Sequence, residues 1–192
     1  MLAGGAGSRF GGGKLVAPWR GGALIDGALA AAFAAPARSV TVVTGHDARV
    51  EAAARAFAER TDEAARLRVV HAPDHAEGMG ATLRTGAASL PADTVGAFVF
   101  LGDMPLIPPA ILPALAAALA AGAPAAAPRF QGQRGHPVLF GQALLPELRA
   151  LKGDEGARAV LRALGDRLAL VESDDEGVLV DIDRPSDIGG PP

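Results

Sequence analysis

The residues that first suggest chemistry are two cations in a glycine-rich stretch near the start of the chain. Residues 2–14 read Leu-Ala-Gly-Gly-Ala-Gly-Ser-Arg-Phe-Gly-Gly-Gly-Lys, with six glycines and with Arg9 and Lys14 as the cations. Glycine adopts positive φ without steric cost, so the backbone N–H groups of such a run can turn inward and bind an anion. No acidic residue precedes Asp26. The pattern predicts a polyphosphate cradle, and a flexible linker is the simpler alternative.

Two common phosphate-binding motifs fit this stretch poorly. The P-loop requires Ser or Thr directly after the lysine, where this chain has Leu15. A dinucleotide fingerprint can be drawn through Gly5 and Gly7, with Asp26 at about the distance expected for a ribose-binding acid. The two cations are foreign to that fingerprint, so the match is weak.

A carboxylate follows the most apolar stretch of the chain. Residues 95–101 form a continuous apolar run, which is typical of a strand covered on both faces, and Asp103 comes next in Gly-Asp-Met-Pro. An isolated buried charge is very costly, so this carboxylate needs solvent, a cation or a metal. Beside a triphosphate its natural partner is Mg²⁺, which takes one or two carboxylates and fills its shell with water and phosphate oxygens. The alternative is that Asp103 caps a helix beginning near Pro108.

A second acidic group follows the last predicted strand. In Asp-Ile-Asp at 181–183, alternation along an extended chain sends Asp181 and Asp183 to one side and Ile182 to the other. Asp187 lies a few residues later, where an acid at a helix N-terminus is the expected role.

The elements that must position these groups alternate between strands and helices. We expect helices over 22–35, 47–60, 78–90, 108–121, 142–151 and 154–164, and strands over 39–44, 67–70, 95–101, 123–128, 137–140, 168–172 and 178–180. Such alternation predicts an α/β fold with an open, mostly parallel sheet. Ligands bind such sheets at the carboxyl ends of the strands. The glycine-rich stretch, Gly45-His46 and Gly102-Asp103 lie at such ends, so we expect them to converge.

Composition sets the broad class of the protein. The 192 residues suit a single domain, and the net charge of −3 offers no field that would recruit nucleic acid or an acidic membrane. The chain has no cysteine, which excludes disulfides and thiolate metal sites and suits a reducing cytosol. The longest apolar run, 110–121, is too short to span a bilayer. We therefore expect a cytoplasmic protein that binds neither nucleic acid nor membrane.

Taken together, these motifs resemble the nucleotidyltransferases of the molybdenum cofactor and nucleoside-diphosphate-sugar type. Residues 2–14 resemble their glycine-rich signature, except that Gly13 stands where Pro or Asp is usual. Residues 75–82 resemble their Glu-Gly-Met segment near the nucleobase. Arg-Gly-His-Pro at 134–137 and Gly-Asp-Glu-Gly-Ala-Arg at 153–158 are similar to the cytidylyltransferase branch. Asp-Ile-Asp at 181–183 also matches, although Arg184 replaces the usual Thr.

The resemblance implies a Rossmann-like nucleotide-diphospho-sugar transferase fold, with one domain over 1–192. Its nucleotide-binding half covers about 1–107 and its acceptor-binding half about 108–187. The implied reaction transfers NMP, preferably CMP, from an NTP to a phosphorylated pterin-type acceptor and releases pyrophosphate. Mg²⁺ is the implied cofactor, and a molybdoenzyme or its maturation chaperone is a further candidate partner.

The resemblance also assigns roles to individual residues. Lys14 and Arg9 are implied to be catalytic, with Lys14 near the α-phosphate and Arg9 holding the β and γ phosphates. Nucleotide contacts are implied for Leu2, Ala3, Gly4, Gly5, Gly7, Ser8, Lys14, Gly45, Gly78, Gly80, Thr82 and Asp103. The implied metal ligands are Asp103 and Asp183, with Asp181 as the weaker candidate. The acceptor would contact Arg134, His136, Asp154 and Arg158.

Three alternatives remain open at this point. Leu-Ala-Gly-Gly at 2–5 resembles the guanylyl branch, and the methyl group absent at Gly4 would leave space that a purine can use. A sugar-phosphate nucleotidyltransferase shares the N-terminal half but should lack the two acceptor motifs. A non-catalytic carrier would keep the cradle and could lose the metal carboxylates. His46, His71 and His75 have no metal-ligand spacing, so we expect solvated or core-edge histidines.

Overall fold

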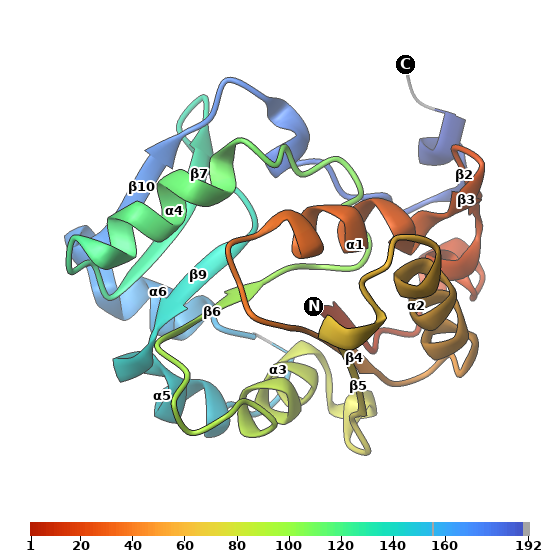
Figure 1. Ribbon diagram of the computed structural model, residues 1–192, viewed down its shortest axis with the longest axis horizontal. Helices are drawn as coiled ribbons and strands as arrows, with labels where there is room; N and C mark the ends of the chain where they lie inside the picture. Colours follow the sequence, from red (N-terminus) through yellow and green to blue (C-terminus); the bar gives the residue numbers. More distant parts are fainter. Residues whose placement is uncertain (155, 190–192) are drawn as a thin grey trace.

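The computed structural model, which describes residues 1–154 and 156–189 apart from the side chain of Arg9, places most strands in two adjacent, mostly parallel sheets (Figure 1). In the first sheet, β1 lies beside β4 and β4 beside β5, all parallel. A parallel bridge between Leu2 and Leu101 connects β1 to the segment that follows β6. In the second sheet the order is β10-β7-β9-β6, and β9 runs antiparallel to both of its neighbours. The expected mostly parallel α/β sheet is confirmed.

The strands of these sheets have the following bounds: β1 Leu2–Ala3, β4 Val40–Thr44, β5 Leu67–His71, β6 Gly96–Val99, β7 Ala125–Phe130, β8 Gln133–Arg134, β9 Val138–Gly141 and β10 Leu168–Glu172. A two-stranded hairpin, β2 (Pro18–Trp19) with β3 (Gly22–Ala23), precedes the first helix. The helices are α1 Leu24–Ala34, α2 Arg49–Arg60, α3 Met79–Ala88, α4 Ile111–Ala120, α5 Leu145–Arg149 and α6 Arg158–Leu164.

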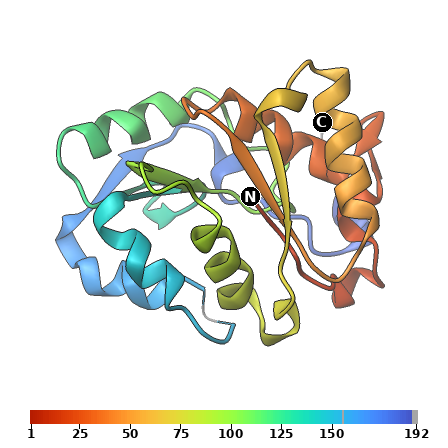
Figure 2. The same cartoon turned by 60° about the horizontal axis from the view of Figure 1, so that its bottom comes forward.

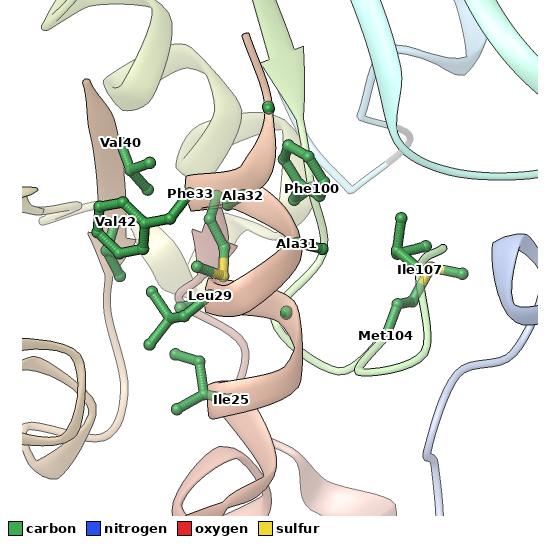
Figure 3. Close-up of a cluster of buried hydrophobic side chains, with 14 of the residues drawn as sticks. Ile25, Leu29, Ala31, Ala32, Phe33, Val40, Val42, Phe100, Met104 and Ile107 are labelled. Carbon is green, nitrogen blue, oxygen red and sulfur yellow. The ribbon is translucent and has the colours of Figure 1, made fainter. Parts of the chain in front are cut away.

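Helices cover both faces of the sheet (Figures 1 and 2). α1, α2 and α4 share one apolar cluster, whose α1 side chains pack against β4 and against the chain after β6. Figure 3 shows Leu29 and Phe33 of α1 near Val42, with Phe100 and Met104 on the other side of the helix. α3, α5 and α6 share a second cluster on the opposite face. Each fully buried Leu or Phe side chain stabilises the fold by about 1.5–3 kcal/mol.

Local chemistry explains where α1 and α2 begin. The Asp26 carboxylate accepts the backbone N–H of Ala23 at 3.2 Å and pairs with Arg60 at 2.9 Å. Asp26 therefore supports the start of α1 and its contact with α2, and it does not line the cavity described below. The Asp47 carboxylate accepts the N–H of Arg49 at 3.0 Å, as expected for an acid before α2.

The structure corrects three of the expected elements. Residues 176–178 form a 3-10 turn instead of starting a strand over 178–180, because the Asp175 carboxylate accepts the N–H of Gly177 at 2.8 Å. The helix expected over 154–164 begins only at Arg158, since Gly156 has φ +58° and cannot continue a helix. The helix expected over 142–151 consists of a 3-10 turn at 142–144 followed by α5. Residues 185–189 form a further 3-10 turn.

Candidate active site

A cavity of about 620 Å³ lies at the carboxyl ends of β1 and β4 and beside the chain that follows β6. This volume is ordinary for a small-molecule site. The predicted residues that line it are Leu2, Ala3, Gly4, Gly5, Gly7, Lys14, Gly78, Thr82, Asp103 and Asp154. The expected convergence of the glycine-rich stretch, the segment after β4 and the segment after β6 at one edge of the sheet is therefore confirmed.

The glycine-rich stretch folds as two short 3-10 turns that place Lys14 under the loop. The turns cover Ser8–Phe10 and Lys14–Val16, and the glycines before them, Gly7 and Gly13, have φ +58° and +65°. A Cβ at Gly7 would lie 3.1 Å from the Cβ of Lys14. Glycine at position 7 therefore serves both the left-handed backbone and the close approach of the lysine side chain.

Lys14 joins two acidic motifs that lie far apart in the sequence. Its Nζ donates to Oδ2 of Asp103 at 2.8 Å and to Oδ1 of Asp183 at 2.9 Å. The lysine side chain is only 9% exposed, whereas the two carboxylates are 29% and 40% exposed. Burial alone would lower the pKa of Lys14, but its hydrogen bonds with Asp103 and Asp183 and their charges outweigh burial, and the pKa is raised. Lys14 is therefore a buried, paired cation rather than the unpaired cation that its local sequence suggests.

Asp181 lies close to this group but outside it. Burial raises the pKa of its carboxyl, and the negative charges of Asp183 and Asp103 raise it further. Among the residues that the structure describes, no three acidic or histidine side chains are arranged to hold a metal by themselves. The carboxylates that the structure brings together are Asp103 and Asp183, both in contact with Lys14. Two carboxylates are a donor set that suits Mg²⁺ completed by water and phosphate oxygens.

Several predicted nucleotide residues lie next to the cavity without lining it. Ser8 is exposed on the first 3-10 turn. Gly45 lies behind the loop, where a Cβ would be 2.6 Å from the carbonyl oxygen of Gly4. Gly80 lies under residues 152–153 and donates its N–H to the carbonyl of Gly153 at 2.9 Å. These glycines permit close backbone packing around the cavity. The predicted role of Arg9 depends on a side chain outside the described part of the chain.

The predicted acceptor residues separate into two groups. Arg134, His136 and Arg158 do not line the cavity, whereas Asp154 does. The pKa of His136 is lowered, mainly by burial and also by the positive charges of Arg134 and Arg158. A hydrogen bond with the backbone of Val99 and the negative charge of Asp103 act in the opposite direction. His136, Arg134, Arg158 and Asp103 therefore share one electrostatic environment. The Nδ1 atom of His136 is buried and has no hydrogen-bond partner among the described residues.

The cavity is also lined by residues that the sequence did not name as nucleotide contacts. His46, His75 and Met79 belong to segments that the sequence had placed at the site, whereas Asp47 was not predicted there. The ring of His75 contacts those of His46 and His71, with centroids 6.3 Å and 5.7 Å away. β4 ends at Thr44, so the strand-end rule that identified Asp103 had also indicated Gly45-His46, and Asp47 is the next residue along the chain. Met79 is the methionine of the Glu-Gly-Met segment that resembles the family's nucleobase segment, and its partly exposed side chain lines the cavity.

Comparison with known proteins agrees with this arrangement. The family model of the MobA-like NTP transferase domain matches residues 1–168. A molybdenum cofactor cytidylyltransferase of Escherichia coli (strain K12) is 28% identical over 188 residues, which cover 97% of this chain and 91% of that protein. A nucleotidyl transferase from Methanothermobacter thermautotroptrophicus is 26% identical, with a TM-score of 0.74 over 97% of this chain and 91% of its own.

A mycobacterial protein shares the same fold. Rv0371c from Mycobacterium tuberculosis H37Rv is 23% identical and superimposes with a TM-score of 0.78 over 97% of this chain and 92% of its own. Its structure in complex with manganese is 22% identical with a TM-score of 0.67, over 91% of this chain and 86% of its own. The present chain belongs to the MobA-like NTP transferases, a family of nucleotidyltransferases with a Rossmann-like fold. In the described part of the chain, every helix is too short or too polar to cross a bilayer.

Proposed function

We propose that this protein transfers a cytidylyl group from CTP to a phosphorylated, pterin-type acceptor of the molybdenum cofactor kind and releases pyrophosphate. The observation that carries the proposal is the meeting of Lys14 with Asp103 and Asp183 beside the glycine-rich loop. These residues come from three separate motifs, and together they provide a cation and two carboxylates where a triphosphate would bind. The likeness to a molybdenum cofactor cytidylyltransferase over nearly the whole chain supports this acceptor class.

In this proposal the protein contributes positioning and charge rather than a nucleophile. The terminal phosphate of the acceptor attacks the α-phosphorus of CTP in line, and pyrophosphate leaves. The backbone N–H groups of the glycine-rich loop bind phosphate oxygens, and Lys14 faces the charge that develops around the α-phosphate. Holding both reactants in this geometry removes much of the entropic part of the barrier. Arg9 is assigned to the β and γ phosphates.

Asp103 and Asp183 are the residues that would hold a divalent cation. Both carboxylates keep partial solvent access and both contact Lys14, so their charges are available at the edge of the cavity. Mg²⁺ would supply charge neutralisation on phosphate oxygens when bound. Lys14 holds the two side chains 2.8 and 2.9 Å from one nitrogen, which keeps two negative groups close together without metal. Asp181 would contribute by its charge rather than as a principal ligand.

Arg134, His136 and Arg158 are assigned to the acceptor. An arginine presents a planar fork of donors that suits phosphate, and two arginines close to His136 make a positive region beside Asp103. The neutral ring of His136 keeps both donor and acceptor character, which suits the polar edge of a pterin. This region lies outside the cavity that contains the glycine-rich loop, so the two substrates would approach from different sides.

A guanylyltransferase is the second candidate, because Leu-Ala-Gly-Gly at 2–5 resembles the guanylyl branch. The main support for that reading was the free space expected at Gly4. A Cβ at Gly4 would lie 2.9 Å from Oγ1 and 3.1 Å from Cγ2 of Thr82, so Thr82 already occupies this space. The argument for a purine is therefore weaker than the sequence alone suggests.

The deciding experiment measures pyrophosphate release. CTP, GTP, ATP and UTP are each supplied with Mg²⁺ and either molybdopterin or a sugar phosphate. We expect turnover with CTP and molybdopterin. Turnover with a sugar phosphate alone would favour the sugar-phosphate class, and nucleotide binding without pyrophosphate release under any combination would favour a carrier. A partner molybdoenzyme or chaperone and the cytoplasmic location remain predictions.

A further inference from the structure

A loop of the predicted acceptor half lies directly on the nucleotide half. Gly80, at the start of α3, donates its N–H to the carbonyl of Gly153 at 2.9 Å. Arg84 donates from Nη1 to the carbonyl of Leu151 at 2.8 Å. Figure 2 shows this loop beside the N-terminal end of α3. The loop is therefore held at the segment that the sequence places near the nucleobase.

Asp154 is the residue of this loop that reaches the cavity. A Cβ at Gly78 would lie 2.6 Å from both Cα and Cβ of Asp154, so the glycine allows the two backbones to meet. Asp154 lines the same cavity as Gly4, Met79 and Thr82. The acceptor residues Arg134, His136 and Arg158 lie elsewhere. Asp154 therefore lies apart from the predicted acceptor-binding residues, with which the resemblance had grouped it.

The carboxylate of Asp154 has free hydrogen-bonding capacity. Within the described part of the chain, it forms no hydrogen bond and no ion pair, and its residue is exposed. The two other acidic residues that line the cavity are paired: Asp103 with Lys14 and Asp47 with Arg49, each at 2.8 Å. An unpaired carboxylate repels phosphate, so the triphosphate is expected at the Lys14 end and Asp154 at the end that takes the base.

We infer that Asp154 is a specificity-determining residue that accepts a hydrogen bond from the exocyclic amino group of the nucleobase. The inference rests on the proposed transfer of CMP. Cytosine presents an amino donor at C4, where uracil presents a carbonyl acceptor that a carboxylate repels. A hydrogen bond to a charged group changes affinity by about 10- to 100-fold. Asp154 therefore selects CTP against UTP, while the acceptor binds elsewhere.

The test measures nucleotide binding without acceptor. Titration calorimetry with CTP and with UTP, both with Mg²⁺, compares wild type with Asp154→Asn and Asp154→Ala. Wild type should bind CTP at least about 10-fold more tightly than UTP. Asp154→Asn should bring the two affinities within about threefold, because the amide can donate to uracil O4. Asp154→Ala should weaken CTP binding and leave UTP binding unchanged or somewhat tighter, because the repulsion of uracil O4 is removed, and this gives a second measurement if the Asn variant melts early.

Asp166→Asn is the matched control, since Asp166 is an exposed acid just before β10, at the opposite edge of the sheet from the cavity. It should bind both nucleotides like wild type. Unchanged CTP and UTP affinities in both Asp154 variants, with a raised KM for the acceptor, would overturn the inference and leave the proposed function standing. Absence of CTP binding in wild type would overturn the proposed function itself. If wild type prefers GTP, comparing GTP with ITP, which lacks the amino group, tests Asp154 directly.

Discussion

Gly4 and Thr82 both line the cavity, and the side chain of Thr82 fills the space that a side chain at position 4 would need. A Cβ at Gly4 would lie 2.9 Å from Oγ1 of Thr82, closer than side-chain carbons normally approach an oxygen, and Thr82 is itself only 4% exposed. The residue pair therefore acts as a unit: the small residue on the loop after β1 makes room for the side chain on α3. Base selection at this point depends on the pair rather than on position 4 alone.

We predict that wild type prefers CTP to GTP, and that Gly4→Ala lowers kcat/KM for both nucleotides because the added methyl group collides with Thr82. A double-mutant cycle with Thr82→Ala should recover much of the loss, since Ala removes both of the close atoms. A coupling of about 0.5–3 kcal/mol is typical of residues in contact. Steady-state kinetics with both nucleotides give the four values. Additive effects, or a higher kcat/KM for GTP in wild type, would contradict this prediction.

Lys14→Ala should lower kcat by about 10²–10³-fold, comparable with the loss of one donor that stabilises a developing charge. The fold should persist, because Asp103 and Asp183 are partly exposed and can be solvated once the lysine is gone. Pyrophosphate release and thermal melting test the two parts of the prediction.

Arg38→Ala is the matched control for Lys14→Ala. Arg38 forms an exposed ion pair with Asp93, and both residues precede strands, so they lie away from the carboxyl edge of the sheet where the cavity is. This variant should keep wild-type turnover, because surface ion pairs contribute little. Turnover of Lys14→Ala within threefold of wild type would show that the lysine is not part of the chemistry.

Activity should require Mg²⁺ or Mn²⁺, and Asp103→Asn and Asp183→Asn should each raise the metal concentration needed for half-maximal turnover. Each removes one anionic oxygen from a site expected to use two. Asp181→Asn should have a smaller effect, because Asp181 does not contact Lys14 in the described hydrogen bonds. Metal titrations of the three variants check the order. A larger effect at Asp181 would reverse the assignment, and full activity in excess EDTA would remove the metal altogether.

His136 should make the stability of the fold depend on pH. Its pKa is lowered mainly by burial, so around pH 6.5 and below the unfolded chain binds more protons than the folded one. The free energy of unfolding should therefore fall as pH drops through 6.5, until the folded protein is protonated as well. Every tenfold change in proton affinity corresponds to about 1.4 kcal/mol. Urea unfolding between pH 5 and 8 should show a weaker pH dependence for His136→Gln, and parallel curves would argue against this role.

Much of the fold was predictable because its elements have strong local patterns. The β-branched run 40–44 forms β4, and the alanine-rich segments before and after it form α1 and α2. The errors lie where a glycine or a side-chain cap decides the backbone. Gly156 with its left-handed backbone delays α6, and the hydrogen bond from Gly177 to Asp175 turns the chain where a strand was expected.

For the candidate site too, local features were predictable from the sequence and long-range contacts were not. By itself, the sequence determined the types of group that meet at the carboxyl edge, because glycine turns and strand ends are local features with fixed directions. Only the tertiary structure decided their pairing: Lys14 contacts carboxylates 89 and 169 residues away, and Asp154 meets Gly78 across the two halves of the chain. Such contacts depend on how helices and strands pack as a whole, and no spacing within a motif specifies them.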